Sequence, residues 1–273
     1  MKPTITAIIL ARNEEPLIEG SIRSLSWCTE VLVIDDSSTD GTAQKAESLG
    51  AKVVSFSHPS FARKRNEALK YSHGEWLFYL DADERVTPTL AKEILVHIET
   101  AEAQVLRCRR ENYAYGHQFT HGGWENDFVT RIFKKTALQE WTGEIHESPV
   151  YSGTVLDLRS PLLHFTHRNT EENLRKSADW TKLEAQLLYK AGEKPVTFPT
   201  LIRKGVMEFF RRAFVRRGYK DGLAGLIEAL VQGINRVIVY IQVWELQQKP
   251  PLPDRYRKMD QELRELWKRE KGL

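Results

Sequence analysis

The stretch EWLFYLDADE, residues 75–84, drives five consecutive apolar residues into a cluster of three acids. The apolar run Trp76–Leu80 is typical of a buried strand, whereas aspartate is rarely buried without a partner. Two interpretations follow: the acids form an ordinary turn into solvent, or they lie at the rim of a sheet and bind a cation. In the second, Asp81 and Asp83 point the same way and offer oxygen ligands suited to Mg²⁺ or Mn²⁺.

Further apolar runs alternate with helical patterns in the first hundred residues. Strands are predicted at Ile5–Ala11, Val31–Ile34 and Lys52–Phe56, with helices near residues 16–25, 40–49, 61–71 and 88–100. Apolar strands separated by helices indicate a parallel sheet covered on both faces. We therefore expect an α/β fold, Rossmann-like, with a mostly parallel sheet and helices on both sides. Ligands bind beyond the carboxyl ends of such strands, which the sequence places at residues 12–15, 35–36 and 81–83.

The remainder of the chain suggests a second region. Strands are predicted at residues 105–109, 128–133 and 154–158, with loops at 116–124 and 141–149, and the pattern is helical from about residue 171. We place a boundary near residue 170, giving a catalytic domain over 1–170 and a helical extension over 171–273.

Composition excludes several classes. The 273 residues are 41% hydrophobic and 28% charged, so the chain can build a core, and a net charge of +3 does not indicate a nucleic-acid partner. The two cysteines, Cys28 and Cys108, have no CxxC spacing and predict neither a disulfide framework nor a zinc site. A reducing cytosol is the simplest setting. The first apolar run is too short for a signal peptide.

The pair Asp35-Asp36 follows the second strand. An aspartate there is well placed to accept hydrogen bonds from a nucleobase or ribose, although a helix-capping turn explains the pair equally well. Neither GxGxxG nor GxxxxGK[ST] occurs, so phosphate binding through those loops is not supported.

Four segments together resemble the family 2 glycosyltransferases: ITAIILARNEE (5–15), VLVIDDSSTDGT (31–42), FARKRNEAL (61–69) and EWLFYLDADER (75–85). They occur in the family's order and at its usual spacing. The resemblance implies the GT-A fold and transfer of a sugar, with inversion, from a nucleotide diphosphate donor.

It also implies residue roles. Asp35 and Asp36 would contact the base or ribose, and the backbone from Ala11 to Asn13 would line the same pocket. Arg65, together with Arg63, would lie near the nucleotide or its phosphates. Asp81 and Asp83 would be the family's D-x-D motif, with Asp83 as the direct ligand of Mg²⁺ or Mn²⁺.

An inverting transfer needs a general base to take the proton of the acceptor hydroxyl. The usual Glu-Asp pair is missing between residues 100 and 170, but Gly143–Glu147 (GEIHE) resembles one branch of the family. We choose Glu147 as the base and His146 as a metal ligand or a partner of the diphosphate, although a loop histidine bonded to a neighbour is also possible. The rivals for the base are Glu144, Glu125 and Asp127. Trp124 and His121–Gly123 either shape the acceptor side or form a packed hairpin.

Residues 200–220 carry seven basic side chains against one acid, Glu208, interleaved with apolar residues. Such a basic amphipathic helix fits an anionic membrane surface, where each basic residue contributes about 1 kcal/mol. The stretch 222–246 is long enough to span a membrane, but Glu228, Asn235 and Arg236 favour a packed or interfacial helix. The alternative is a helical subdomain with solvated arginines.

Softer motifs at 161–165 (PLLHF), 173–176 (NLRK) and 218–222 (GYKDG) look like a subgroup of glucosyltransferases that act on lipopolysaccharide core. That resemblance implies a UDP-sugar donor, UDP-glucose, and a lipid-linked saccharide acceptor at the cytoplasmic membrane face. Lys176 and His164 are then candidates for binding the diphosphate or a charged acceptor, although neither residue requires a function. The alternatives are transfer to polyprenyl phosphate or another polysaccharide precursor, and a non-catalytic nucleotide-sugar or membrane-binding module.

Overall fold

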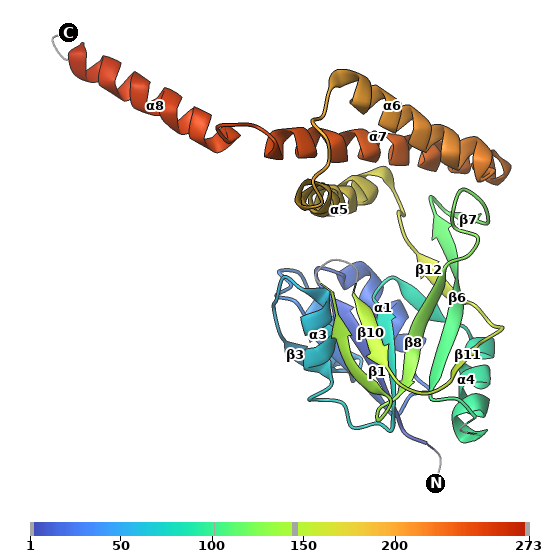
Figure 1. Ribbon diagram of the computed structural model, residues 1–273. Coiled ribbons are helices and arrows are strands. Elements are labelled where there is room, and N and C mark those ends of the chain that lie inside the picture. The colour runs from blue at the N-terminus through green and yellow to red at the C-terminus, as the bar shows by residue number, and fades with distance from the viewer. Residues whose placement is uncertain (1–2, 101, 144–146, 271–273) are drawn as a thin grey trace. The chain divides into compact units, whose positions relative to one another are not determined.

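The computed structural model describes residues 3–100, 102–143 and 147–270 (Figure 1). The chain forms two compact units. The first comprises Met1–Thr120 with Trp124–Arg168, and the second comprises His121–Gly123 with Asn169–Leu273.

A mixed sheet forms the centre of the first unit. Its strands are β1 (Ile5–Ala11), β2 (Glu30–Asp35), β3 (Lys52–Ser55), β4 (Trp76–Asp81), β5 (Glu84–Val86), β6 (Val105–Ala114), β7 (His117–Phe119), β8 (Phe128–Lys134), β11 (Val155–Asp157) and β12 (Leu162–Phe165). The order is β3-β2-β1-β4-β8-β6-β12-β5, and β7 and β11 also pair with β6. Strands β1 to β4 are parallel, whereas β8 runs antiparallel between β4 and β6. The predicted α/β fold is confirmed.

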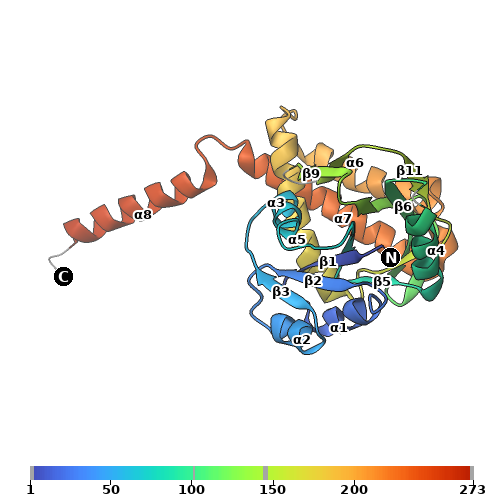
Figure 2. The same cartoon turned by 90° about the horizontal axis from the view of Figure 1, so that it is seen from below.

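Both faces of the parallel strands are covered, which explains their continuous apolar sequence. The helices are α1 (Glu15–Arg23), α2 (Thr42–Ser48), α3 (Phe61–Ala68) and α4 (Pro88–Thr100). Ala7 and Ile9 of β1 belong to the core beneath α1, α2 and α4. Ile8, on the other face, packs with α3 and with the hairpin β9 (Leu138–Thr142)–β10 (Ser148–Tyr151). Figure 2 shows α1 and α2 on one side of the sheet and α3 on the other.

The strand register gathers the predicted polar clusters at one edge. Ala11 is paired with Asp35 and Leu10 with Asp81, so β1, β2 and β4 end together. The loops that carry the candidate residues therefore leave the sheet on the same side.

Several predicted boundaries were wrong in the second half of this unit. Strand β6 continues beyond Arg109 to Ala114, and β7 lies inside the predicted loop 116–124. The predicted loop 141–149 contains the end of β9 and the start of β10. Strands of three to five residues with mixed polar composition carry little periodic signal, so β5, β7, β9, β10 and β12 escaped prediction.

The described part of the second unit is helical. It contains α5 (Thr170–Lys190), α6 (Phe198–Phe210), a π-helical turn (Arg211–Val215), a 3₁₀ turn (Gly218–Asp221), α7 (Gly222–Leu246) and α8 (Leu252–Arg269). Helices α6 and α7 cross where both carry glycine. A Cβ atom on Gly205 would lie 2.5 Å from Val237 Cγ2 and 3.3 Å from the carbonyl oxygen of Gly233. Any larger residue at this crossing would push the helices apart.

Polar side chains of α7 pair with α5. Arg236 Nη1 lies 2.6 Å from Glu184 Oε1, and Asn235 Nδ2 donates to Ser177 Oγ at 2.9 Å. Among the described residues, one helical stretch, Gly218–Leu246, is long and apolar enough to cross a membrane by length and composition. Two of its polar residues are nevertheless engaged inside the helical unit.

Candidate active site

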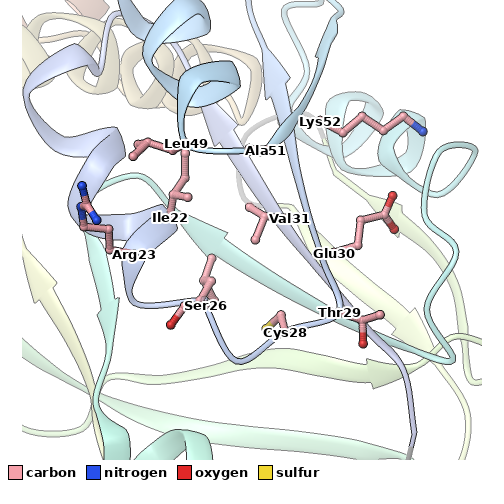
Figure 3. Close-up of a pocket in the computed structure, with 12 residues that line it drawn as sticks. Ile22, Arg23, Ser26, Cys28, Thr29, Glu30, Val31, Leu49, Ala51 and Lys52 are labelled. Atoms are coloured by element: carbon pink, nitrogen blue, oxygen red, sulfur yellow. The ribbon is translucent and has the colours of Figure 1, made fainter.

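The candidate site lies at the carboxyl edge of β1, β2 and β4. A separate pocket, drawn in Figure 3, lies at the opposite edge, where β2 begins at Glu30 and β3 begins at Lys52. It contains none of the residues predicted to bind donor or metal, so we do not assign it to the transfer reaction.

Arg65 on α3 is central to the site. Its Nη2 lies 3.1 Å from Asp81 Oδ1 and 3.1 Å from Glu147 Oε1, while its Nε donates to the same glutamate oxygen at 3.2 Å. The guanidinium lies over the ring of Trp141, 4.8 Å from its centroid, and next to Tyr79 at 5.7 Å. Arg65 thus connects the predicted D-x-D motif with the predicted base.

Asp81 is held by a second guanidinium. Arg131 of β8 donates to its Oδ2 and, at 3.1 Å, to Glu84 Oε1. Burial raises the pKa of Asp81, but the charges of Arg131, Arg65 and Arg110 outweigh it and hold that pKa far below the ordinary value. Asp81 is therefore ionised across the physiological range.

Glu84 is fully buried and contacts both Asp81 and Arg131. Its Oε2 accepts a hydrogen bond of 2.9 Å from the backbone N–H of Asp81, and its Oε1 also lies 3.3 Å from Arg110 Nη1. A buried carboxylate requires such partners. Glu84 fixes the end of β4, a role that sequence reasoning did not assign.

Asp83 has different neighbours from Asp81. Strand β4 ends at Asp81, so the alternation of side chains does not extend to Asp83, which lies in the turn. Its Oδ2 lies 3.5 Å from His164 Nε2, and its carbonyl oxygen accepts from the N–H of Phe165 at 2.8 Å. His164 Nδ1 lies 2.6 Å from Asn112 Oδ1.

Asp36 at the end of β2 is paired with Lys64 of α3. Lys64 Nζ lies 2.8 Å from Asp36 Oδ2, and both side chains are buried. Burial raises the pKa of Asp36, but hydrogen bonds from Lys64 and Ser57 and the charges of Lys64 and Arg12 lower it below its usual value. The preceding Asp35 accepts from the N–H of Ser38 through Oδ2. Within the described structure, its buried Oδ1 has no hydrogen-bond partner.

Asn13 joins the loops that follow β1 and β2. It has a φ of 55°, a left-handed conformation that asparagine tolerates. Its Oδ1 accepts from the N–H of Thr39 at 2.8 Å, and its own N–H donates to Ser38 Oγ at 2.9 Å. Ala11, two residues earlier, is buried at the end of β1.

The remaining predicted residues have the following surroundings. Arg63 is exposed on α3, whereas Lys64 and Arg65 face inward. Lys176 belongs to the second unit, where its Nζ lies 3.7 Å from Glu172 Oε1. Glu144 and His146 lie outside the described residues. Within those that are described, no group of three His, Cys, Asp or Glu side chains is arranged to hold a metal ion.

The rivals of Glu147 differ in environment. Glu125 is exposed. Asp127 accepts from Arg110 Nε and Nη2 at 2.9 and 3.0 Å and from Asn112 Nδ2 at 2.9 Å. Burial raises the pKa of Asp127, but Arg110 and Asn112 lower it overall, which weakens it as a base.

The residues proposed for the acceptor side lie in both units. In the second, the N–H of His121 donates to Asp221 Oδ2 at 2.8 Å, and the N–H of Gly122 donates to the carbonyl of Arg216 at 2.8 Å. In the first, the ring of Trp124 packs at centroid distances of 6.1 Å from Phe119 and 6.0 Å from His167.

The sequence analysis did not predict the contacts of Lys64 and Glu84. It also did not predict those of Arg110 and Asn112 on β6 or of Arg131 on β8. Lys64 stands inside the motif FARKRNEAL, and its position beside Arg65 was the available signal. Arg110 and Asn112 gave none, because they become neighbours of Glu84 and His164 only through the order of strands β8, β6 and β12.

Comparison with known proteins identifies the family of the chain. The model of glycosyl transferase family 2 matches residues 6–154. The lipopolysaccharide core biosynthesis glycosyltransferase LpsC of Rhizobium meliloti (strain 1021) is 26% identical over 93% of this chain and 97% of its own length. A glycosyltransferase of Rickettsia bellii (strain RML369-C) is 28% identical over 89% and 86%.

Among solved structures, glucosyl-3-phosphoglycerate synthase from Mycobacterium tuberculosis, crystallised with Mn²⁺ and UDP-glucose, is 27% identical. The match covers 40% of this chain and 44% of that one, with a TM-score of 0.36. This chain thus spans less than half of that structure.

The chain belongs to glycosyltransferase family 2, as the family model matches more than half of its length and overlaps all four motifs. The protein is therefore a glycosyltransferase with a GT-A catalytic domain and C-terminal helices, and it is related to a lipopolysaccharide core enzyme.

Proposed function

We propose that the protein transfers a hexose, glucose, from a UDP-sugar to a lipid-linked saccharide such as lipopolysaccharide core, with inversion at the anomeric carbon. The observation that carries this proposal is the carboxyl edge of the sheet, where β2 ends at Asp35 and β4 ends at Asp81, which Arg65 contacts at 3.1 Å. The acceptor class is supported by the printed name of the Rhizobium relative.

Two buried polar atoms support donor binding here. Asp35 Oδ1 and Arg65 Nη1 are enclosed without hydrogen-bond partners among the residues described. Burying an unpaired polar atom is costly, so both atoms favour a ligand that completes them. A base or ribose donor group suits Asp35, and a diphosphate oxygen suits Arg65.

A divalent cation fits Asp83 together with His164. When His164 is neutral with its hydrogen on Nδ1, its Nε2 and the Asp83 carboxylate 3.5 Å away are both acceptors, and a cation between them relieves their repulsion. This oxygen–nitrogen pair suits Mn²⁺ better than Mg²⁺. When bound, the ion supplies positive charge to the departing diphosphate. His146 remains a proposed further ligand.

Glu147 is the proposed base. Arg65 holds its Oε1, which orients the carboxylate toward the end of β4. Engagement of Arg65 by a diphosphate would weaken that contact and leave Glu147 a stronger acceptor for the proton of the sugar hydroxyl.

The second unit provides a surface suited to a membrane. Exposed apolar side chains occur on all of its helices, and those on α6, on α7 and on the turn between them include Phe198, Ile202, Met207, Phe210, Phe214, Val215, Leu223, Ile227 and Leu230. Val215 is 77% exposed and Leu223 is 74% exposed, which is unusual for water-facing helices. With the basic residues of 200–220, this pattern supports peripheral binding to the cytoplasmic membrane face.

A donor screen tests the proposal. The full chain is incubated with UDP- or GDP-sugars, Mn²⁺ or Mg²⁺, and a lipid extract from a Gram-negative envelope, and nucleotide release is measured. UDP release that requires both UDP-glucose and a saccharide-bearing lipid is the expected result. Release with polyprenyl phosphate alone would identify the alternative acceptor.

A further inference from the structure

A chain of polar contacts leads from Asp127 through Asn112 and His164 to Asp83. Asn112 Nδ2 donates to Asp127 Oδ2 at 2.9 Å, Asn112 Oδ1 lies 2.6 Å from His164 Nδ1, and His164 Nε2 lies 3.5 Å from Asp83 Oδ2. The strand register fixes the central step, because Asn112 on β6 is directly paired with His164 on β12.

The chemistry of Asp127 determines the orientation of Asn112. Arg110 binds both oxygens of Asp127, as expected for an ionised carboxylate. An ionised carboxylate only accepts hydrogen bonds, so the amide NH₂ of Asn112 must face it. The carbonyl oxygen of the amide is then turned toward His164.

The orientation of Asn112 in turn determines where the proton of His164 resides. Since Asn112 Oδ1 is an acceptor, the facing Nδ1 of His164 must carry hydrogen. In the neutral ring, Nε2 is left with a lone pair, and it faces Asp83. Asn112 is only 1% exposed, so water does not readily replace its amide as a partner.

We propose that Asn112 and Asp127 are positioning residues that hold His164 as its Nδ1–H tautomer, with the Nε2 lone pair directed at Asp83. The inference rests on the proposed function in one respect: the Nε2 lone pair would bind the same divalent cation as Asp83. Partners of this kind commonly change metal affinity by about 10- to 100-fold.

The tautomer can be measured without metal or turnover. The full chain is labelled with ¹⁵N-histidine, and the ring shifts of His164 are recorded at pH 8.5 with chelator. The signal is assigned by its absence from His164→Gln, since the chain has eight histidines. The wild type is expected to show a protonated Nδ1 and an unprotonated Nε2. The reverse pattern would overturn the proposal.

Three variants sharpen this test. Asn112→Leu removes the acceptor and is expected to shift His164 toward the Nε2–H tautomer. Asn112→Asp retains an oxygen opposite Nδ1 and, by sharing a proton with Asp127, is expected to keep the wild-type tautomer. Glu111→Gln is the matched control. Glu111 immediately precedes Asn112 on β6, but its carboxylate is paired with Arg109 at 3.1 Å. An unchanged tautomer in folded Asn112→Leu, or a lost one in folded Asn112→Asp, would refute the positioning role.

Mn²⁺ binding, followed by loss of the free-ion electron paramagnetic resonance signal, separates this inference from the proposed function. Asn112→Leu should bind Mn²⁺ about 10- to 100-fold more weakly than the wild type, with Glu111→Gln unchanged. If wild-type protein shows the Nδ1–H tautomer but binds no Mn²⁺, the positioning role stands and the cation site of the proposed function is wrong.

Discussion

Arg65 and Glu147, 82 residues apart in sequence, are joined by two hydrogen bonds that converge on one carboxylate oxygen, at 3.2 and 3.1 Å. The same guanidinium reaches Asp81. A single buried arginine thus sets the position of the candidate base relative to the end of β4. A change of Arg65 is therefore expected to affect both the proposed donor site and the proposed base.

Arg65→Lys should lower kcat/KM by about 100- to 1,000-fold, because a single ammonium cannot contact Glu147, Asp81 and a phosphate in the fork geometry of a guanidinium. Steady-state kinetics with the donor found in the screen measure this loss. Arg63→Lys, on the exposed side of the same helix, is the control and should stay near wild type. Equal effects of the two changes would contradict the assigned role of Arg65.

Glu147→Gln should lower kcat by about 100-fold or more while changing the donor KM little. The amide oxygen still accepts from Arg65, so the loss reflects proton transfer rather than position. Glu140→Gln, exposed on the neighbouring strand β9, provides the comparison. If Glu125→Gln inactivates the enzyme and Glu147→Gln does not, the base has been misassigned.

Asp83→Asn and Asp81→Asn should fail in different ways. Asp83→Asn should abolish turnover and leave the thermal unfolding midpoint close to wild type. Asp81→Asn should also destabilise the fold by roughly 2 kcal/mol, because Arg131 and Glu84 lose part of a buried network while the exposed part of Asp81 limits the effect. Retention of more than a few per cent of activity by Asp83→Asn would argue against a cation at this residue.

The Asp36–Lys64 pair predicts a pH-dependent contribution to stability. The pKa of Asp36 is lowered in the folded protein, so its contribution is present above the unfolded value of 3.8 and is lost as pH falls below it. Lys64→Met should cost about 3 kcal/mol near pH 7, since the buried carboxylate of Asp36 loses its ammonium partner. Urea unfolding should show a smaller difference in unfolding free energy between wild type and Lys64→Met at pH 3 than at pH 7. A constant difference between variant and wild type would exclude this linkage.

Membrane binding by the second unit predicts that the full chain cosediments with vesicles containing phosphatidylglycerol and is released by salt. Replacing Val215, Leu223 and Leu230 together by serine should weaken this binding at least 10-fold, because the three exposed side chains lose their apolar contact. Deletion from residue 200 should abolish it. Val96→Ser, at a valine that is 57% exposed on α4 of the first unit, is the control. Undiminished cosedimentation of the triple variant would show that this surface does not bind the bilayer.

The sequence was sufficient for the first four parallel strands because each is apolar, short and followed by a polar loop. It also placed Asp35 and Asp81 at one edge, since the carboxyl ends of parallel strands meet there, whereas the position of Arg65 followed only from the family resemblance. The order of the four motifs, rather than any single motif, favoured the interpretation of the D-x-D as a donor and metal site over that of an ordinary turn.

The remaining contacts required the three-dimensional structure. Glu84 looks like the start of a turn, yet it becomes the buried partner of Arg131 because β8 folds back antiparallel against β4. The partnership of Asn112 with His164 depends on β12 lying beside β6, a parallel pairing between residues 52 positions apart. No local pattern encodes such long-range pairings.

The antiparallel return of β8 has a practical consequence for engineering the enzyme. The first hundred residues resemble a self-contained nucleotide-binding cassette, but Asp81 and Glu84 obtain Arg131 from outside that segment. A chimera joined near residue 100 would therefore bury two carboxylates against whatever the foreign half supplies. Exchange of acceptor specificity between relatives should succeed only when β8 is taken from the same protein as residues 1–100.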